Sequence, residues 1–273
     1  MTDQNTTDIM LRASGVRVVY NEGKQNAVEA IRRIDVELRR GEILALVGPS
    51  GCGKTTLFNA IAGLIPTQEG RIDVAGELVE DAHGHVGYML QKDLLLPWRS
   101  VLENVILGLE VRNTSKQEAR KIAKAYIERY GLGGFENARP SQLSGGMRQR
   151  VALMRTLAFN PDVILLDEPF SALDFQTRLL LQAEVTTIIR EQQKSVILIT
   201  HDIGEAITMA DRIIVLSNRP ARVKAVHNVL IDKENLDPAR FRIQPEFQTL
   251  FAEIWAELDL GTGMQLAPAV HDT

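Results

Sequence analysis

The chain has 273 residues, of which 45% are hydrophobic and 24% are charged, and its formal net charge is −4. A chain of this length and composition is globular, and it can bury a core for one large domain or for a domain with a subdomain. The small negative charge gives no global reason to bind nucleic acid. The single cysteine, Cys52, excludes an internal disulfide and a multi-cysteine metal site.

The start of the chain predicts where the protein resides. Residues 1–8 are polar and lack the basic and apolar regions of a secretory signal, so we expect a flexible N-terminus and a chain that remains in the cytosol. No apolar stretch approaches the ~18 residues that are needed to span a bilayer. Any role at a membrane is therefore expected to run through a partner.

Short apolar patterns predict several strands in the first part of the chain. Arg12–Tyr20 and Arg32–Leu38 contain alternating apolar residues, which favour half-buried strands. Gly70–Val79 predicts a hairpin with its turn at Ala75-Gly76. We therefore expect an N-terminal antiparallel β subdomain.

The stretch Ile43–Leu57 is an apolar strand that leads into a glycine-rich turn and then a helix. Gly48, Gly53, Lys54 and Thr55 fit the phosphate-loop pattern G-x-x-x-x-G-K-T/S. The glycines let successive backbone N–H groups point at one anion, and the helix adds the positive end of its dipole. Lys54 can then reach the β- and γ-phosphates, while the Thr55 hydroxyl can bind Mg²⁺. The alternative is an ordinary turn between a strand and a helix. The predicted nucleotide-binding residues are Gly48, Pro49, Ser50, Gly51, Cys52, Gly53, Lys54, Thr55 and Thr56.

Two short segments follow the predicted hairpin. His83-Gly84-His85 could form a metal clamp, but it has no third ligand nearby and a solvated loop is the better interpretation. Val86–Leu90 predicts a short strand that leads to Gln91.

From Lys92 to Phe159 the pattern becomes helical, which predicts a helical subdomain, about residues 92–160, inserted into an α/β core. The apolar run Leu94–Trp98 contains a proline, so it cannot be an ordinary helix interior. Ser115–Glu118 fits a capping box at the start of a helix that Gly131 ends.

After the helical region, apolar strands alternate with helices. Val163–Leu166, Val196–Thr200 and Arg212–Leu216 are predicted strands. Gln176–Gln193 predicts a helix whose inward residues are Leu180, Leu181, Val185, Ile188 and Ile189. Continuous apolar strands separated by helices are typical of a parallel sheet covered on both faces. The predicted fold is therefore α/β, with its main domain over residues 9–220.

The C-terminal part, residues 221–273, is predicted to contain an edge strand and one helix. Arg222–Ile231 is the expected edge strand. Pro245–Leu260 predicts an amphipathic helix, for which packing against the core is favoured over a partner groove. Its apolar face consists of Phe247, Leu250, Phe251, Ile254 and Leu258.

Polar residues follow three of the buried strands. Ile43–Val47 leads into the phosphate loop, the next core strand leads into Asp167 and Glu168, and a third leads into His201. A ligand of an open parallel sheet lies beyond the carboxyl ends of the strands. The polar residues at the carboxyl ends of these three strands are therefore expected to surround one phosphate.

The residues at these strand ends have distinct predicted roles. Asp167 is placed to hold Mg²⁺ directly or through water, and Glu168 can polarise a water for attack on the γ-phosphate. The alternative is that the two carboxylates only cap the next helix. His201 can contact the γ-phosphate or serve as a structural histidine. Gln91 could bind Mg²⁺ or water, although the sequence alone would not select it.

A second anion cradle is predicted at Leu143–Arg150, where Ser144, Gly145 and Gly146 begin a helix. A simple helix N-cap is the alternative. Because the chain already has one cradle, the second is best explained if it completes a nucleotide site on another copy.

These residues together resemble the ATP-binding-cassette (ABC) ATPases over about Leu11–Val223. The matching segments are Gly48–Thr56 as Walker A, Gln91 as the Q-loop, Leu143–Met147 as the signature, Val163–Glu168 as Walker B, Ser171–Asp174 as the D-loop and His201 as the switch histidine. Walker A recurs across many ATPases, whereas a signature between Q-loop and Walker B is highly specific. The resemblance implies a P-loop NTPase (RecA-like) core with ATP and Mg²⁺ as cofactors. It implies that Glu168, His201 and Gln91 are catalytic, and that Thr55, Gln91 and Asp167 hold the metal.

The resemblance also implies a head-to-tail dimer that sandwiches two ATP molecules. Ser144, Gly145 and Gly146 would close the Walker site of the other copy. Tyr20 looks like the aromatic residue that stacks on adenine, a contact of about 1–3 kcal/mol by analogy with base stacking. Asp174 would link the two sites. One departure is Met147, where glutamine is common; it removes a side-chain hydrogen bond but not the backbone cradle.

Asp93–Val105 and Ser144–Val151 resemble the nitrate, sulfonate and taurine importer ATPases, as does the Pro245–Leu260 tail. This implies a subunit on the cytoplasmic face of the inner membrane that drives a separate permease and, indirectly, a substrate-binding protein. In such transporters the segment after the Q-loop docks a coupling helix of the permease. Leu95, Leu96 and Trp98 would then be an exposed apolar contact, with core packing as the alternative.

Three other functions remain open. A cassette that acts on nucleic acid needs a long coiled coil, a zinc insertion or tandem cassettes; Lys54 and Ser144 are too close to hide the first two, and the motifs occur once. A small-molecule kinase would leave Ser144–Met147 and His201 unused. An ABC exporter ATPase made as a separate chain is opposed only by the Leu94–Val105 resemblance.

Overall fold

The structure is a computed structural model that describes residues 9–79, 85–171, 173–231 and 241–258. The predicted flexible N-terminus, the residues His83 and Gly84, and Ala172 of the D-loop lie outside this part of the chain. The strands are β1 (Ile9–Tyr20), β2 (Val28–Arg39), β3 (Ile43–Val47), β4 (Glu69–Val74), β5 (Glu77–Leu78), β6 (Val86–Met89), β7 (Val163–Asp167), β8 (Ser195–Ile199), β9 (Arg212–Leu216) and β10 (Val223–Asn228). The α-helices are α1 (Lys54–Ile61), α2 (Val101–Val105), α3 (Leu107–Val111), α4 (Lys116–Arg129), α5 (Gly145–Leu157), α6 (Phe175–Glu191), α7 (Ile203–Met209) and α9 (Pro245–Glu257).

Two sheets form the α/β body of the molecule. The core sheet has the order β10-β9-β3-β8-β7-β6, in which β10 alone is antiparallel to its neighbour. The second sheet, β2-β1-β4-β5, is antiparallel throughout. The predicted parallel sheet, the antiparallel N-terminal strands, the hairpin at Ala75-Gly76 and the C-terminal edge strand are therefore confirmed.

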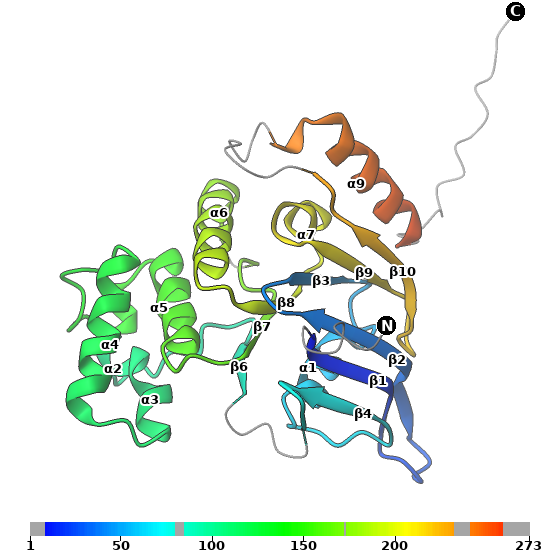
Figure 1. Cartoon of the computed structure of the whole chain (residues 1–273), viewed down its shortest axis with the longest axis horizontal. Helices are drawn as coiled ribbons and strands as arrows, with labels where there is room; N and C mark the ends of the chain where they lie inside the picture. Colours follow the sequence, from blue (N-terminus) through cyan, green and yellow to red (C-terminus); the bar gives the residue numbers. More distant parts are fainter. Residues whose placement is uncertain (1–8, 80–84, 172, 232–240, 259–273) are drawn as a thin grey trace, which may run out of the picture.

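The core sheet is covered on both faces, which explains why its central strands read as continuous apolar runs. Side chains of β3 alternate between the two apolar cores: Ala45 faces the helices α5, α6 and α7, whereas Leu44 and Leu46 face α1 and the second sheet. Figure 1 shows α1 between the two sheets and α6 and α7 above the core sheet. The carboxyl ends of β3, β8 and β7 consequently lie side by side, as the sequence predicts.

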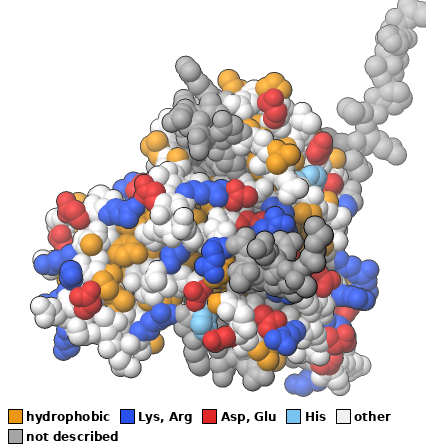
Figure 2. Space-filling model, in the orientation of Figure 1, with side chains coloured by type: hydrophobic (Ala, Val, Ile, Leu, Met, Phe, Trp, Pro, Cys, Tyr) orange, Lys and Arg blue, Asp and Glu red, His pale blue; other side chains and the backbone are white. Residues whose placement is uncertain are grey.

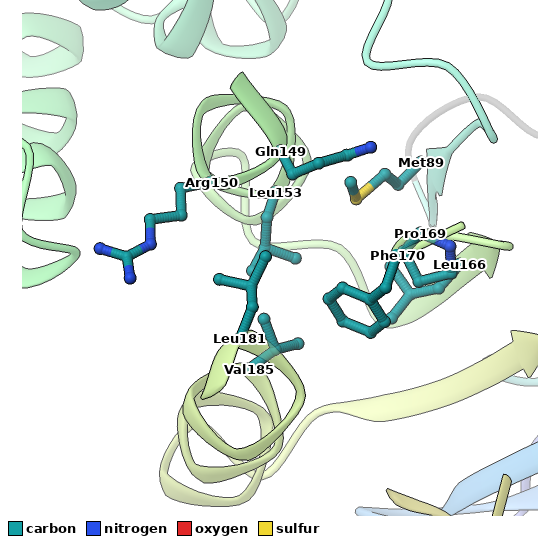
Figure 3. A pocket seen from close by; sticks show the side chains of 9 residues that line it. All are labelled: Met89, Gln149, Arg150, Leu153, Leu166, Pro169, Phe170, Leu181 and Val185. Carbon is teal, nitrogen blue, oxygen red and sulfur yellow. The ribbon is translucent and has the colours of Figure 1, made fainter. Parts of the chain in front are cut away.

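Helices α2 to α5 form a separate lobe beside the core sheet, on the left in Figure 1. The Ser115 side chain caps α4 by accepting from the Glu118 backbone N–H at 3.3 Å. The lobe contacts the core through apolar side chains of α5 and α6. Figure 3 shows Leu153 of α5 pointing toward Leu181 and Val185 of α6. This contact connects α5, which begins after Ser144, to α6, which follows Asp167 and Glu168 along the chain.

Two predictions about apolar residues are wrong. The sequence predicts that Leu180 and Leu181 both face inward; Leu181 is buried, but Leu180 is 70% exposed, because α6 turns only Leu181 toward the core. Leu95 was expected in an exposed patch, but it is 8% exposed and belongs to the core. Leu96 is half-buried, while Trp98 is 69% exposed as predicted.

The C-terminal helix α9 packs its apolar side against α7 and the core. Phe247, Ile254 and Leu258 are buried, and Leu250 and Phe251 pack partly buried against the same core. Packing against the core is thus confirmed for this helix. Leu260, the predicted end of the helix, lies outside the described residues.

Candidate nucleotide-binding site

The phosphate loop joins β3 to α1 in a conformation that requires glycine. Gly53 has φ 128°, and a Cβ there would lie 2.8 Å from the Ala30 carbonyl oxygen. Gly53 is also the N-cap of α1, where no side chain accepts from the first backbone N–H groups of the helix. Uncapped N–H groups at a helix start are a favourable place for an anion. The start of α1 therefore presents backbone N–H groups that suit an anion such as a phosphate.

Lys54 is buried at the start of α1 and curls back over the loop. Its Nζ donates to the carbonyl oxygens of Gly48 at 2.8 Å and Pro49 at 3.0 Å. The ammonium group thus lies directly beside the backbone that would cradle the phosphates. It needs only to exchange these carbonyls for phosphate oxygens.

Thr55 and Asp167 come together at the carboxyl ends of β3 and β7. The Thr55 hydroxyl donates to Asp167 Oδ2 at 3.1 Å, and the Tyr88 hydroxyl donates to the same oxygen at 3.4 Å. Burial raises the pKa of the Asp167 carboxyl, and the nearby Glu168 charge raises it further. A divalent cation at this point would offset both effects and favour the ionised carboxylate. Tyr88 is a member of this site that the sequence analysis missed, although it lies in a predicted strand.

One carboxylate oxygen of Glu168 lies close to the side chains of both Gln91 and His201. Gln91 Nε2 donates to Glu168 Oε2 at 2.9 Å, and His201 Nδ1 lies 3.2 Å from the same oxygen. Glu168 has φ 47°, which is uncommon for a residue with a Cβ. Its backbone N–H donates to the Ile199 carbonyl at 2.9 Å, which holds this left-handed turn against β8. The turn directs the Glu168 side chain toward the ends of β6 and β8.

Tyr20 lies next to the end of the phosphate loop. Its hydroxyl donates to Thr56 Oγ1 at 3.2 Å, and 40% of the residue is exposed. The ring is therefore available to a planar group at the edge of the loop. The structure brings this predicted adenine contact to the site.

Two predicted groups lie apart from the phosphate loop of the same chain. Ser144 caps α5 by accepting from the Met147 N–H at 3.3 Å. Asp174 caps α6 by accepting from the Thr177 N–H at 3.0 Å, which lowers the pKa of Asp174. Among the described residues, no hydrogen bond or ion pair joins Ser144, Gly145, Gly146 or Asp174 to the phosphate loop.

The segment that follows Gln91 is held by side chains that the sequence analysis did not single out. Arg155 of α5 donates to the carbonyl oxygens of Leu94 at 2.8 Å and Asp93 at 2.7 Å. Asn104 of α2 is fully buried, and its amide bonds the backbone on both sides of Pro97: it accepts from Leu96 N–H at 2.8 Å and donates to Ser100 O at 2.9 Å.

Replacing Asn104 with alanine is expected to destabilise the protein by about 1–3 kcal/mol, because backbone groups of a partly buried loop lose their partner. The shift in the urea unfolding midpoint measures this loss. The exposed Gln117→Ala on α4 is the control and should change the free energy of unfolding by less than about 0.5 kcal/mol. Equal effects of the two substitutions would contradict the role of Asn104.

Comparison with known proteins agrees with this geometry. The profile of the ABC transporter family matches residues 31–171. The ABC transporter ATP-binding protein YtlC of Bacillus subtilis is 47% identical over 230 residues, covering 84% of this chain and 88% of that protein. The taurine import ATP-binding protein TauB of Rhizobium johnstonii is 41% identical over 253 residues, covering 91% of this chain and 96% of that protein.

Solved structures give the same picture. The dimeric structure of MJ0796, a bacterial ABC transporter cassette, matches with a TM-score of 0.72 and 31% identity, covering 82% of this chain and all of that one. CbiO1 of Clostridium perfringens, part of the ABC transporter complex cbiONQ, matches with a TM-score of 0.72 and 26% identity, covering 81% of this chain and 89% of that one. Across the described residues, none of the helices has the length and apolar character to cross a bilayer.

Proposed function

Because the chain belongs to the ABC transporter family, we propose that it is the ATP-hydrolysing subunit of an ABC importer for a small solute, and that it drives a separate membrane permease. The observation that carries this proposal is the convergence of Gln91, Glu168 and His201 beside the phosphate loop and Asp167. This arrangement combines a phosphate cradle, a site for a divalent cation and a carboxylate held in place by two other side chains.

The residues of the site fit ATP with Mg²⁺. The uncapped start of α1 and Lys54 would hold the phosphates, and Tyr20 would stack on adenine. Thr55, Asp167 and Gln91 would hold Mg²⁺, which when bound supplies charge neutralisation on the phosphate oxygens. Their hydroxyl, carboxylate and amide oxygens are the ligands that this hard cation prefers.

Hydrolysis in this proposal depends on Glu168 as the general base. Its carboxylate would orient an attacking water and accept a proton from it. Gln91 Nε2 lies 2.9 Å and His201 Nδ1 lies 3.2 Å from its Oε2, so they would hold the carboxylate in place. Both side chains would also contact the γ-phosphate or its surroundings. Release of phosphate would alter both contacts and so change the positions of the Q-loop and the switch loop.

The signature residues would complete an ATP site in a head-to-tail dimer. Ser144, Gly145 and Gly146 do not reach the phosphate loop of their own chain, and the cassette MJ0796 is a dimer. In the proposed dimer, the start of α5 in one copy closes the ATP site of the other. The Met147 backbone N–H donates to Ser144 Oγ and so holds this serine at the start of α5, a contact that does not depend on a glutamine side chain.

Importer function is supported by the taurine import relatives and by the surface that follows the Q-loop. In this segment Leu94 is 50% exposed and Trp98 is 69% exposed, while Leu95 anchors the loop in the core. We assign Leu94 and Trp98, rather than Leu95, to the contact with the permease. Nitrate, sulfonates and taurine are the solute classes that the resemblance favours. The subunit would then be peripheral, on the cytoplasmic face of the inner membrane.

Replacing Trp98 with alanine is expected to weaken association with the permease by about 2 kcal/mol or more, as for other exposed tryptophans at the centre of interfaces. Transport should fall while the ATPase activity of the isolated subunit is unchanged. Trp255→Ala is the matched control, since Trp255 is 51% exposed on the distant α9. Loss of folding in Trp98→Ala would instead favour a packing role for Trp98.

The other candidate functions have less support. On the face shown in Figure 2, Lys and Arg side chains are interspersed with Asp and Glu, and no broad basic surface for nucleic acid appears there. A kinase would leave the signature unused. An exporter subunit shares the whole ATP site, so the permease that copurifies with the protein from its own host membranes is the deciding test. Copurification of a substrate-binding protein with that permease supports an importer, and its absence together with an export activity refutes one.

A further inference from the structure

A buried carboxyl group is hydrogen-bonded to the residue that precedes the switch histidine. Glu205 of α7 is 4% exposed, and its Oε2 accepts a 2.7 Å hydrogen bond from the hydroxyl of Thr200, itself 1% exposed. The other oxygen of Glu205 has no hydrogen-bond partner among the described residues. Buried carboxyl groups are rare and costly, so this one needs an explanation that simple packing does not supply.

The Thr200 hydroxyl connects Glu205 to the backbone around His201. It donates to Glu205 and accepts from the Asp202 N–H at 3.0 Å, so it links the residue before His201 to the residue after it. Because Glu205 Oε2 accepts this hydrogen bond, it determines the direction of the Thr200 O–H bond. With its hydrogen committed to Glu205, the oxygen lone pairs of Thr200 face the Asp202 N–H.

Asp202 holds the other side of the same loop. Its Oδ1 accepts from the Glu205 N–H at 3.1 Å, and its Oδ2 lies 3.5 Å from Nη1 of Arg178. Arg178 in turn donates to the Leu173 carbonyl at 3.0 Å, in the D-loop. The switch loop and the D-loop are thereby joined through the side chains of Asp202, the N-cap of α7, and Arg178 of α6.

We propose that Glu205 is a positioning residue for ATP hydrolysis, which acts through the Thr200 hydroxyl to hold His201 in contact with Glu168. This inference rests on the proposed function of His201. Glu205 itself does not touch the reacting groups. It orients the Thr200 hydroxyl, which bonds the backbone on the other side of His201. The His201 side chain is more than half exposed and lies 3.2 Å from Glu168 Oε2.

The charges around Glu205 favour a neutral carboxyl group. The pKa of Glu205 is raised to about 8, chiefly by burial and also by the negative charges of Asp202 and Glu168, which together outweigh the lowering effects of the Thr200 hydrogen bond and the Arg178 charge. The Arg242 guanidinium also lies close to the start of α7: a Cβ added to Gly204 would be 3.0 Å from Arg242 Nη1. A neutral carboxyl group and a carboxamide both offer an acceptor to Thr200. Glu205→Gln should therefore keep the network intact.

The pH dependence of stability checks the neutral state. The pKa of Glu205 is raised from 4.5, so the unfolded chain loses this proton at lower pH than the folded protein does. Wild-type stability is expected to fall as pH rises from about 4.5 to about 8, and this component should be missing in Glu205→Gln. Thermal unfolding midpoints of both proteins across this range measure the difference. Parallel pH curves would overturn the neutral assignment.

Thr200→Val is the central test, because it removes the hydroxyl and keeps the shape. We expect kcat for ATP to fall about 10–100-fold, as for other small misplacements of a catalytic group, with KM for ATP within about twofold. Thr200→Ser should restore turnover. The matched control is Thr208→Val on α7, the helix that carries Glu205; it removes a hydroxyl that donates to Gly204 O at 2.6 Å and, among the described residues, makes no hydrogen bond to Thr200, His201 or Asp202.

A double-mutant cycle with His201→Ala separates positioning from general packing. Single-turnover hydrolysis should be no slower in Thr200→Val/His201→Ala than in His201→Ala alone. Unchanged kcat in a folded Thr200→Val protein, or an equal loss in the His201→Ala background, would overturn the proposal. Wild-type turnover in His201→Ala itself would instead refute the function proposed for His201, so the two failures are distinguishable.

Discussion

Replacing Glu168 with glutamine is expected to lower ATP turnover by about 10²–10⁴-fold while ATP binding persists. A carboxamide has nearly the shape of the carboxylate, so Gln91 and His201 keep a neighbour at this position. It cannot accept a proton from the attacking water. With binding intact and hydrolysis blocked, the protein should accumulate as a dimer that holds ATP. Steady-state ATPase rates and size-exclusion chromatography with ATP measure the two effects.

A charge-matched control is available on α6. Glu191 is exposed and paired with Arg129, and such a surface ion pair contributes little to stability. Glu191→Gln should therefore hydrolyse ATP at the wild-type rate and form no lasting ATP-bound dimer. Near-normal turnover in Glu168→Gln would remove Glu168 as the general base, whatever its effect on the dimer.

Mixing two inactive variants is expected to restore ATP sites. Lys54→Ala damages the phosphate loop, and Ser144→Arg blocks the signature cradle, so neither protein alone should occlude ATP. In a head-to-tail dimer of one copy of each, one site combines both defects and the other contains none. The mixture should therefore occlude a single ATP per mixed dimer. Glu168→Gln as a common background prevents hydrolysis during the measurement, and bound nucleotide per dimer is counted after separation.

The stoichiometry identifies which copy supplies the signature. Mixing two preparations that carry the same change, Lys54→Ala with Lys54→Ala, is the control and should occlude no ATP. If the Ser144→Arg protein alone occluded ATP as well as its parent, each pocket would be independent of the serine of its neighbour. That result would remove the head-to-tail arrangement and, with it, the use proposed for the signature.

Several features of the fold follow from local patterns. The apolar runs of β3, β7 and β8 have both faces buried in the structure, as an uninterrupted run indicates. The glycine and lysine spacing of the phosphate loop is equally local, because its geometry depends on neighbouring backbone atoms. These elements could be predicted because each depends on residues that are close together in the chain.

The two wrong burial assignments have a common cause. Leu179, Leu180 and Leu181 are consecutive, so a helical pattern admits more than one inward face, and the packing of α5 and α7 selects Leu181. In the loop before α2, Leu95 is turned inward because Arg155 and Asn104 bind the backbone on either side of it. Neither partner is adjacent in sequence to the leucine it positions.

The order of motifs along this chain was enough to indicate a phosphate loop, a second cradle and three strands with polar residues at their carboxyl ends, because each is a short pattern with its own chemistry. Tertiary structure alone decided which side chains meet: that Gln91 and His201 share one oxygen of Glu168, that Tyr88 joins Asp167, and that Glu205 lies behind Thr200. These contacts join residues from different strands and helices. Their distances are set by the parallel register of the core sheet and by the packing of α6 and α7, which no local pattern encodes.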